Sequence, residues 1–142
     1  MKFVFLLIAI PLVFARELSV LVIGTLTCHG LPAQYAELQL VSKKVFGGGA
    51  FARDVFTDPS GNFQIAGYID LDAPSWATID ARIYIWHKCY EKPYEQSDSC
   101  YNWFEIGIPK LFINEGPLAQ KTWDLGEIRL EVPKKGQQLD AC

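Results

Sequence analysis

The dominant pattern along this chain is an alternation of hydrophobic and polar positions with a period of two. Successive side chains of a β-strand point to opposite faces, so this period predicts strands with one buried face. In the first such segment, residues 18–28, the apolar face comprises Leu18, Val20, Val22, Leu26 and Cys28. The same pattern predicts further strands at 36–40, 51–57, 62–67, 81–89, 103–108, 111–113 and 125–132.

The segments between these strands carry turn signals rather than helices. Asp58-Pro59-Ser60-Gly61 is a turn sequence, because Pro presets φ and Gly accepts a positive φ. Only one helical turn, near residues 72–77, is predicted, and Gly47-Gly48-Gly49 lacks the following helix and Lys of a phosphate-binding loop. Short strands at roughly ten-residue spacing predict an all-β fold, an antiparallel two-sheet sandwich of seven to eight strands.

The first fifteen residues have the composition of a secretory signal peptide. Lys2 precedes an apolar run over residues 3–14, which is shorter than the about 20 residues that a membrane span needs. Val13-Phe14-Ala15 resembles a small-residue cleavage site, and the charged Arg16 follows. We expect a signal peptide at residues 1–15, a single domain at residues 16–142, and a secreted, extracellular protein.

The charge of the mature chain excludes some partners. The chain has 13 basic and 16 acidic residues, and removal of Lys2 with the leader leaves 12 basic residues and a net charge of −4. No basic run offers a footprint for nucleic acid, and Lys134-Lys135 is too short for a membrane-binding patch. We therefore expect no nucleic-acid partner, and no motif indicates a cofactor.

Four cysteines in a secreted chain predict two disulfides, with three possible connectivities. The polar stretch between Cys89 and Cys100 is typical of a loop between adjacent strands, so we expect these two to pair. That leaves Cys28 with Cys142. The rival interpretation is a zinc site, which the absence of a Cys-x-x-Cys motif disfavours, and we expect no metal.

Several motifs along the mature chain resemble a known family. They are Gly24-x-Leu26-x-Cys28, Pro32-Ala33, Thr57-Asp58-x-x-Gly61-x-Phe63-x-x-x-Gly67, Ile85-x-His87-x-Cys89, Cys100, Ile108-Pro109, Asp124-Leu125-Gly126 and a terminal Cys142. In this order they resemble the nematode transthyretin-like family. The resemblance implies a prealbumin-like sandwich that is secreted, non-enzymatic and binds lipids, small hydrophobic ligands or cell-surface partners.

The same fold is used by 5-hydroxyisourate hydrolases, so an enzymatic function must also be considered. Those enzymes require two His, an Arg and a C-terminal Tyr-Arg-Gly-Ser, whereas this chain ends in Leu-Asp-Ala-Cys. His29 and His87 fall in other motifs. The catalytic residues of the hydrolase are therefore missing, and we predict that the protein is not an enzyme.

Two groups of polar residues require a choice between a structural and a functional role. His87 has the strand parity of the core-facing Ile83 and Ile85, which favours a hydrogen-bonded core histidine over a catalytic one. Acidic residues at four positions have the ligand chemistry of calcium, but solvated acids are the more common case. These acids are Asp70, Asp72, Asp80 and Asp98.

The alternation also predicts an aromatic outer face. If Ile83 and Ile85 face inward, residues of the opposite parity on this strand face outward, as do Tyr101 and Trp103 on the next strand. The predicted binding face comprises Arg82, Tyr84, Trp86, Lys88, Tyr101 and Trp103. Trp, Tyr and Arg are frequent anchors of protein interfaces. The alternative is that these rings pair across strands or lie beneath the loop at 90–99.

Taken together, the sequence predicts a secreted binding protein that presents this aromatic face to an extracellular protein or a lipid surface. Arg82 and Lys88 would steer an anionic partner. The second hypothesis is a carrier that holds a small hydrophobic ligand in an internal or intersubunit cavity. Self-association into a homo-oligomer stays open, because a sandwich can leave an edge strand available for pairing.

Overall fold

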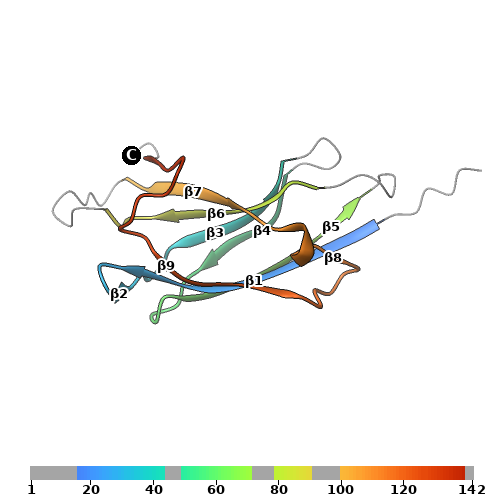
Figure 1. The fold of residues 1–142 in the computed structure, drawn as a ribbon, viewed down its shortest axis with the longest axis horizontal. Helices are drawn as coiled ribbons and strands as arrows, with labels where there is room; N and C mark the ends of the chain where they lie inside the picture. The colour runs from blue at the N-terminus through green and yellow to red at the C-terminus, as the bar shows by residue number, and fades with distance from the viewer. Residues whose placement is uncertain (1–15, 44–48, 72–78, 91–99, 140–142) are drawn as a thin grey trace, which may run out of the picture.

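The computed structural model describes residues 16–43, 49–71, 79–90 and 100–139 as two β-sheets packed face to face. Figure 1 shows the two layers, with β3, β4, β6 and β7 in one and β1, β5 and β9 in the other. Seven strands have six residues or more, as predicted for the sandwich. None of the described segments contains a helix long and apolar enough to cross a membrane. The predicted leader lies outside the described residues and stays a prediction.

The first sheet is organised around one long strand, β1 (Arg16–Cys28). On one side β1 pairs antiparallel with β5 (Asn62–Leu71) from Arg16↔Leu71 to Thr25↔Asn62. On the other side it pairs in parallel with β9 (Thr122–Arg129), a parallel pair in an otherwise antiparallel fold. The two-residue strands β2 (Leu31–Pro32) and β8 (Asn114–Glu115) also pair with β1.

The second sheet has the strand order β10-β7-β6-β3-β4. Its centre is β6 (Ala81–His87), which pairs antiparallel with β3 (Glu37–Ser42) and with β7 (Asn102–Gly107). The outer strands are β4 (Gly49–Phe56) and the two-residue β10 (Gln138–Leu139). The predicted Gly47-Gly48-Gly49 connection falls mostly outside the described residues, and Gly49 begins β4.

The core between the sheets contains the apolar residues that the alternation predicted. From the first sheet come the fully buried Val20, Val22 and Leu26, and from the second come Ile83 and Ile85. Burial of a large aliphatic side chain contributes about 1.5–3 kcal/mol, so this shared core is the main stabilising term for both layers.

The predicted turn before β5 is confirmed, and it is tied to β1. Asp58 Oδ1 accepts hydrogen bonds from the backbone N–H of Ser60 and of Asn62, both at 2.9 Å. Gly61 has φ of +78°, and a Cβ there would clash with the carbonyl oxygen of Leu26. Glycine is therefore required at Gly61 by both its backbone conformation and this close approach.

Two local predictions are wrong. The segment 111–113 is not a strand, because Lys110–Phe112 form a 3-10 helix, η2, in which Phe112 N–H bonds to the Pro109 carbonyl at 2.9 Å. The last long strand, β9, ends at Arg129 instead of residue 132. Beyond it Leu130 N–H bonds to the Thr27 carbonyl, and Val132 is 43% exposed. The helical turn predicted at 72–77 lies outside the described residues.

The disulfide pairing predicted from the sequence is also wrong. Cys28, at the end of β1, is bonded to Cys89, two residues beyond β6. The register His87↔Asn102, extended by two residues, would set Cys89 opposite Cys100, which is the relation that the sequence suggested. However, Cys89 is buried on the core-facing side of β6, so its sulfur reaches across to the other sheet. The disulfide therefore joins the two layers instead of closing a hairpin.

Cys100 is disulfide-bonded as well, and the described residues contain no free cysteine. Since Cys28 and Cys89 are bonded to each other, we predict that Cys100 pairs with Cys142, the one cysteine left in the sequence. Non-reducing peptide mapping tests both pairings. Trypsin leaves Cys89 and Cys100 on one peptide, so a second cleavage after Glu91 or Glu95 is needed. Recovery of a Cys89–Cys100 peptide would contradict this connectivity.

Loss of the Cys28–Cys89 disulfide should destabilise the fold. It closes a loop with a sequence separation of 61, for which loop entropy gives about 4 kcal/mol. The double variant Cys28→Ala/Cys89→Ala should lose free energy of unfolding of that order in a urea titration. An unchanged unfolding midpoint would show that the bond does not constrain the unfolded chain.

Candidate functional site: the outer face of the second sheet

Three aromatic rings from the two central strands contact one another on the outer face of the second sheet. Trp86 lies directly across from Trp103 in the register, and their ring centroids are 6.4 Å apart in a stacked arrangement. Tyr84 lies 5.7 Å from Trp86 and 5.7 Å from Trp103. We call these three residues the aromatic ladder. All three side chains are half-buried, and Tyr84 meets Trp86 edge-on.

The ladder forms because the alternation on β6 is uninterrupted. Ala81, Ile83, Ile85 and His87 are buried, while the residues between them are half-buried and face outward. On β7 the buried Phe104 fixes the parity, so its neighbours Trp103 and Glu105 face outward too. The inward and outward positions of both strands therefore agree with the prediction from sequence.

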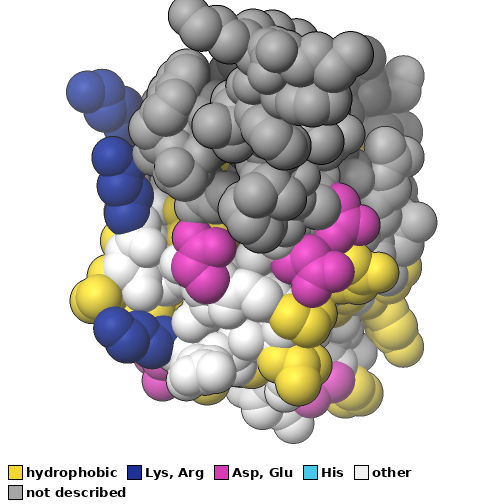
Figure 2. Space-filling view, turned by 90° about the vertical axis from the view of Figure 1, so that its right-hand side faces the viewer, with side chains coloured by type: hydrophobic (Ala, Val, Ile, Leu, Met, Phe, Trp, Pro, Cys, Tyr) yellow, Lys and Arg dark blue, Asp and Glu magenta, His cyan; other side chains and the backbone are white. Residues whose placement is uncertain are grey.

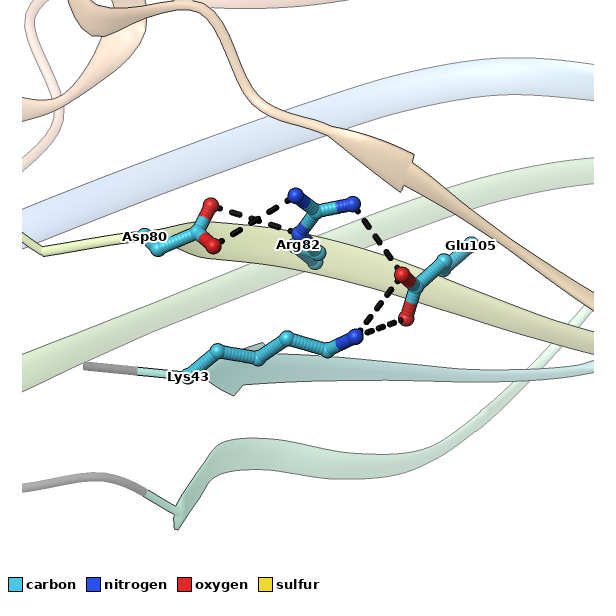
Figure 3. Close-up of polar contacts among 4 residues, drawn as sticks. All are labelled: Lys43, Asp80, Arg82 and Glu105. Atoms are coloured by element: carbon cyan, nitrogen blue, oxygen red, sulfur yellow. Dashed lines mark hydrogen bonds and ion pairs between the residues drawn. The ribbon is translucent and has the colours of Figure 1, made fainter.

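A network of paired charges borders the ladder at the end where β6 begins. Figure 3 shows that Glu105 is contacted by both Arg82 and Lys43. Arg82 Nη1 lies 3.0 Å from Glu105 Oε1, and Lys43 Nζ lies 2.7 Å from Glu105 Oε2. Arg82 Nε also lies 3.3 Å from Asp80 Oδ1. Two cations and two carboxylates thus sum to zero charge.

The network fixes the charge states of its members. Burial alone would raise the pKa of Glu105, but its hydrogen bonds from Lys43 and Tyr84 and the nearby Arg82 charge outweigh burial and lower that pKa. The hydrogen bond to Glu105 raises the pKa of Lys43, and the bond to Asp80 raises the pKa of Arg82. Burial raises the pKa of the neighbouring Tyr84. Glu105, Lys43 and Arg82 are therefore charged at neutral pH.

The structure separates the six predicted binding residues into three groups. Tyr84, Trp86 and Trp103 form the ladder, and Arg82 belongs to the charge network beside it. Tyr101 and Lys88 instead form a pair of their own, with Lys88 Nζ 4.6 Å from the centroid of the Tyr101 ring. This pair lines a cavity next to the Cys28–Cys89 disulfide. The predicted single face is thus two neighbouring features.

His87 is a core residue, in agreement with the prediction. It is 2% exposed, packs edge-on against Phe104 with ring centroids 5.8 Å apart, and accepts a hydrogen bond at Nδ1 from the Cys89 backbone N–H at 3.0 Å. Burial is the main cause that lowers the pKa of His87 to about 4, and the charge of Lys134 acts in the same direction. The imidazole is therefore neutral at physiological pH, with its proton on Nε2.

The candidate cation sites do not form a cage in the described part of the chain. Asp80 is engaged by Arg82, and Asp70 is an exposed strand residue opposite Glu17, while Asp72 and Asp98 lie outside the described residues. Cys28, His29 and Cys89 come within metal-ligand distance of one another. Both sulfurs are used in the disulfide, so this group offers no thiolate ligand.

The end of the sandwich where β1 begins and β5 ends carries charges of both signs. Figure 2 shows acidic side chains across the middle of this face, hydrophobic side chains beside them and basic side chains along one edge. A surface that binds polyanions gathers basic residues into one patch. In the described part of this face acidic side chains lie beside the basic ones, so it presents both signs of charge.

The sequence did not reveal the partners of the charged residues. Lys43 lies just after β3, and its contact with Glu105 on β7 spans 62 residues. The register places β3 and β7 on either side of β6, so all three strands contribute to one surface. If the strand order β7-β6-β3 had been deduced from the sequence, it would have predicted that Lys43 and Glu105 lie on the same surface.

Comparison with known proteins shows which family this chain resembles. The profile of the Transthyretin-like family matches residues 23–109. Transthyretin-like protein 2 of Caenorhabditis elegans is 28% identical over 128 residues, which cover 86% of this chain and 81% of that protein. Transthyretin-like protein 46 of the same organism is 28% identical over 121 residues, covering 82% of this chain and 62% of that protein.

One solved structure, a 9R-lipoxygenase from Cyanothece PCC8801, aligns with a TM-score of 0.44 and 17% identity. The alignment covers 80% of this chain and 16% of that chain, and it carries no argument at this level of similarity.

The two sheets form a β-sandwich of the transthyretin-like type. The chain belongs to the Transthyretin-like family. This membership confirms the resemblance seen in the motifs and supports an extracellular, binding-type role in general. Family membership does not identify the partner or the surface that contacts it.

The buried, neutral His87 predicts an acid-sensitive fold. Its folded-state pKa of about 4 lies below the ordinary value of 6.5, so between these values the unfolded chain binds more protons than the folded one. This contribution to stability is complete above pH 6.5 and is lost as the pH falls toward 4, by about 3 kcal/mol in total.

The measurement is urea unfolding at a series of pH values between 4 and 7. His87→Asn keeps an acceptor near the Nδ1 position and should lose this part of the pH dependence, while the exposed His29→Asn should behave as the wild type. Parallel pH profiles for the wild type and His87→Asn would contradict the prediction.

Proposed function

We propose that this protein is a secreted, non-enzymatic binding protein that presents the aromatic ladder to an extracellular protein partner. The observation that carries the proposal is the mutual contact of Tyr84, Trp86 and Trp103 on the outer face of the second sheet. Trp and Tyr dominate the energetics of protein interfaces, because each supplies a large, rigid area with a polar atom at its edge.

The surroundings of the ladder favour a protein over a membrane. A membrane-binding surface needs an excess of basic residues or apolar side chains that insert between lipids. The ladder is half-buried, and the four charges at its border cancel. An apolar centre with a rim of satisfied polar groups is the usual organisation of a protein interface.

The sequence analysis predicted that Arg82 steers an anionic partner, and the charge network changes this role. Its guanidinium is held by Asp80 and Glu105, so Arg82 supplies a fixed hydrogen-bonding edge and no uncompensated charge for steering. Specificity at this border would come from geometry, because a partner must accommodate the network without separating its charges.

The carrier hypothesis is the second candidate. The space between the sheets is filled by fully buried side chains such as Phe104, Leu38 and Leu40, so a ligand there would have to displace them. A cavity of about 410 Å³ beside the Cys28–Cys89 disulfide is the feature that favours this hypothesis. Self-association through the ladder is a further form of protein binding, and native mass spectrometry distinguishes it.

Removal of both indoles should abolish binding without unfolding the protein. In Trp86→Ala/Trp103→Ala the centre of the ladder is lost, while every core residue stays in place. We expect labelled protein to lose at least tenfold in affinity for intact cells and extracellular material of the source animal, since central aromatic anchors contribute about 2 kcal/mol or more. Loss of the cross-strand interaction itself should lower the free energy of unfolding by about 1 kcal/mol, and the lost burial of the two half-buried indoles adds to this.

The matched control is Phe56→Ala/Tyr68→Ala, which removes two exposed rings, 51% and 57% exposed, from β4 and β5. It should bind like the wild type. Equal binding by the ladder variant would contradict the proposal. Binding that survives protease treatment of the cell surface, or that is reproduced by protein-free phosphatidylcholine–phosphatidylserine vesicles, would identify a lipid surface instead.

A further inference from the structure

The strand β5 is the longest regular edge among the described strands. It pairs with β1 on one side over its whole length of ten residues, without a register shift. The other edges are shorter or irregular, because β4 and β9 have register shifts against their neighbours and β2, β8 and β10 have two residues each. Proteins protect their edges with bulges, short strands, proline or lysine, and β5 contains none of these.

Every second residue of β5 points its backbone N–H and C=O groups away from β1. Leu26 N–H donates to the Gly61 carbonyl, which makes the neighbouring Thr25 and Asn62 a non-hydrogen-bonded pair of the ladder. Since the two kinds of pair alternate, the same holds for each second residue after Asn62. The residues whose backbone groups face the free edge are Asn62, Gln64, Ala66, Tyr68 and Asp70.

Only the first member of this row uses its edge groups within the described part of the chain. Asn62 N–H donates to Asp58 Oδ1 and its carbonyl accepts from Asp58 N–H, each at 2.9 Å. The other four members have no hydrogen-bond partner for these groups among the described residues. A row of unpaired donors and acceptors is a template on which another strand can extend the sheet.

The outward side chains of β5 suit a second copy of the same strand. All of them are exposed, and Asp70 is the one that carries a charge. In two antiparallel copies related by a twofold axis at Gly67, Gln64 of one copy lies opposite Asp70 of the other, so the amide can donate to the carboxylate. Ala66 lies opposite Tyr68 and leaves room for its ring. No two like charges face each other in this arrangement.

The same register also satisfies the backbone. The residues that face each other are those whose N–H and C=O groups point to the edge, so all the free groups of both copies become paired. Gly67 meets its own copy in a non-hydrogen-bonded pair, where the Cα atoms approach to about 4.5 Å, and it has no side chain to oppose this approach. An axis at Ala66 would instead set Asp70 opposite Asn62, whose groups are already bonded in the turn.

We propose that two copies of this protein pair through β5, antiparallel and with the twofold axis at Gly67, and so continue the first sheet across a dimer. The proposal assigns a strand to the self-association that the sequence left open. It does not rest on the function proposed for the aromatic ladder, because the ladder lies on β6 and β7 of the other sheet.

Analytical ultracentrifugation of the oxidised mature protein measures the association, and charge substitutions at Gln64 test the register. We expect a reversible equilibrium between monomer and dimer. Gln64→Asp sets like charges opposite each other at both ends of the pairing and should weaken the dimer about tenfold, whereas Gln64→Lys should strengthen it. Adding Asp70→Asn to the Gln64→Asp variant removes the repulsion and should restore the dimer.

A proline substitution tests the backbone pairing directly. Ala66→Pro removes an N–H that faces the free edge, so no bond to β1 is lost, and the variant should fold as a monomer. Ala66→Ser keeps the N–H, is the matched control and should dimerise like the wild type. In hydrogen exchange followed by NMR, the amides of Gln64 and Tyr68 should be protected in the dimer and exchange rapidly in Ala66→Pro.

Three results would overturn the proposal. The first is a monomer at the highest soluble concentration of the wild type. The second is a dimer that is equally stable in Gln64→Asp and Ala66→Pro, and its loss in Trp86→Ala/Trp103→Ala would place the contact on the ladder. The third is protection of the Gln64 and Tyr68 amides in a monomer, because those groups would then be bonded within one chain.

Discussion

The position of β6 at the centre of the second sheet is the constraint on which both candidate sites depend. Hydrogen bonding to β3 on one side and β7 on the other fixes its register, so the strand cannot slip by one residue without exchanging its two faces. Ile83 and Ile85 then secure one face in the core, and Trp86 is held on the other. The Cys28–Cys89 bond just beyond the strand fastens this arrangement to β1.

The aromatic ladder and the cavity both lie on this strand. Along its outward face Tyr84 and Trp86 contact Trp103 of β7, and the charges beside these rings are paired within the sheet. At its end, His87 and the Cys28–Cys89 disulfide line a cavity.

The local alternation made much of this predictable. The inward parity of His87 and the outward parity of Trp86 and Trp103 follow from a period of two, which needs no knowledge of the neighbouring strands. The disulfide partner of Cys89 did not follow, because sequence places Cys100 across the hairpin but does not show that the Cys89 sulfur points to the other sheet. For the same reason, contacts between distant strands, such as Lys43 with Glu105, became visible only with the strand order.

The central claim, that the aromatic ladder contacts the partner, is tested most directly by hydroxyl-radical footprinting of the native protein before and after it binds extracellular material of the source animal. Mass spectrometry then reports the oxidation of each ring. Burial of the ladder predicts that oxidation of Trp86 and Trp103 falls several-fold on binding, while oxidation of Tyr68 on β5 is unchanged. Unchanged oxidation of both indoles together with protection of Tyr68 would place the interface on the opposite sheet and contradict the claim.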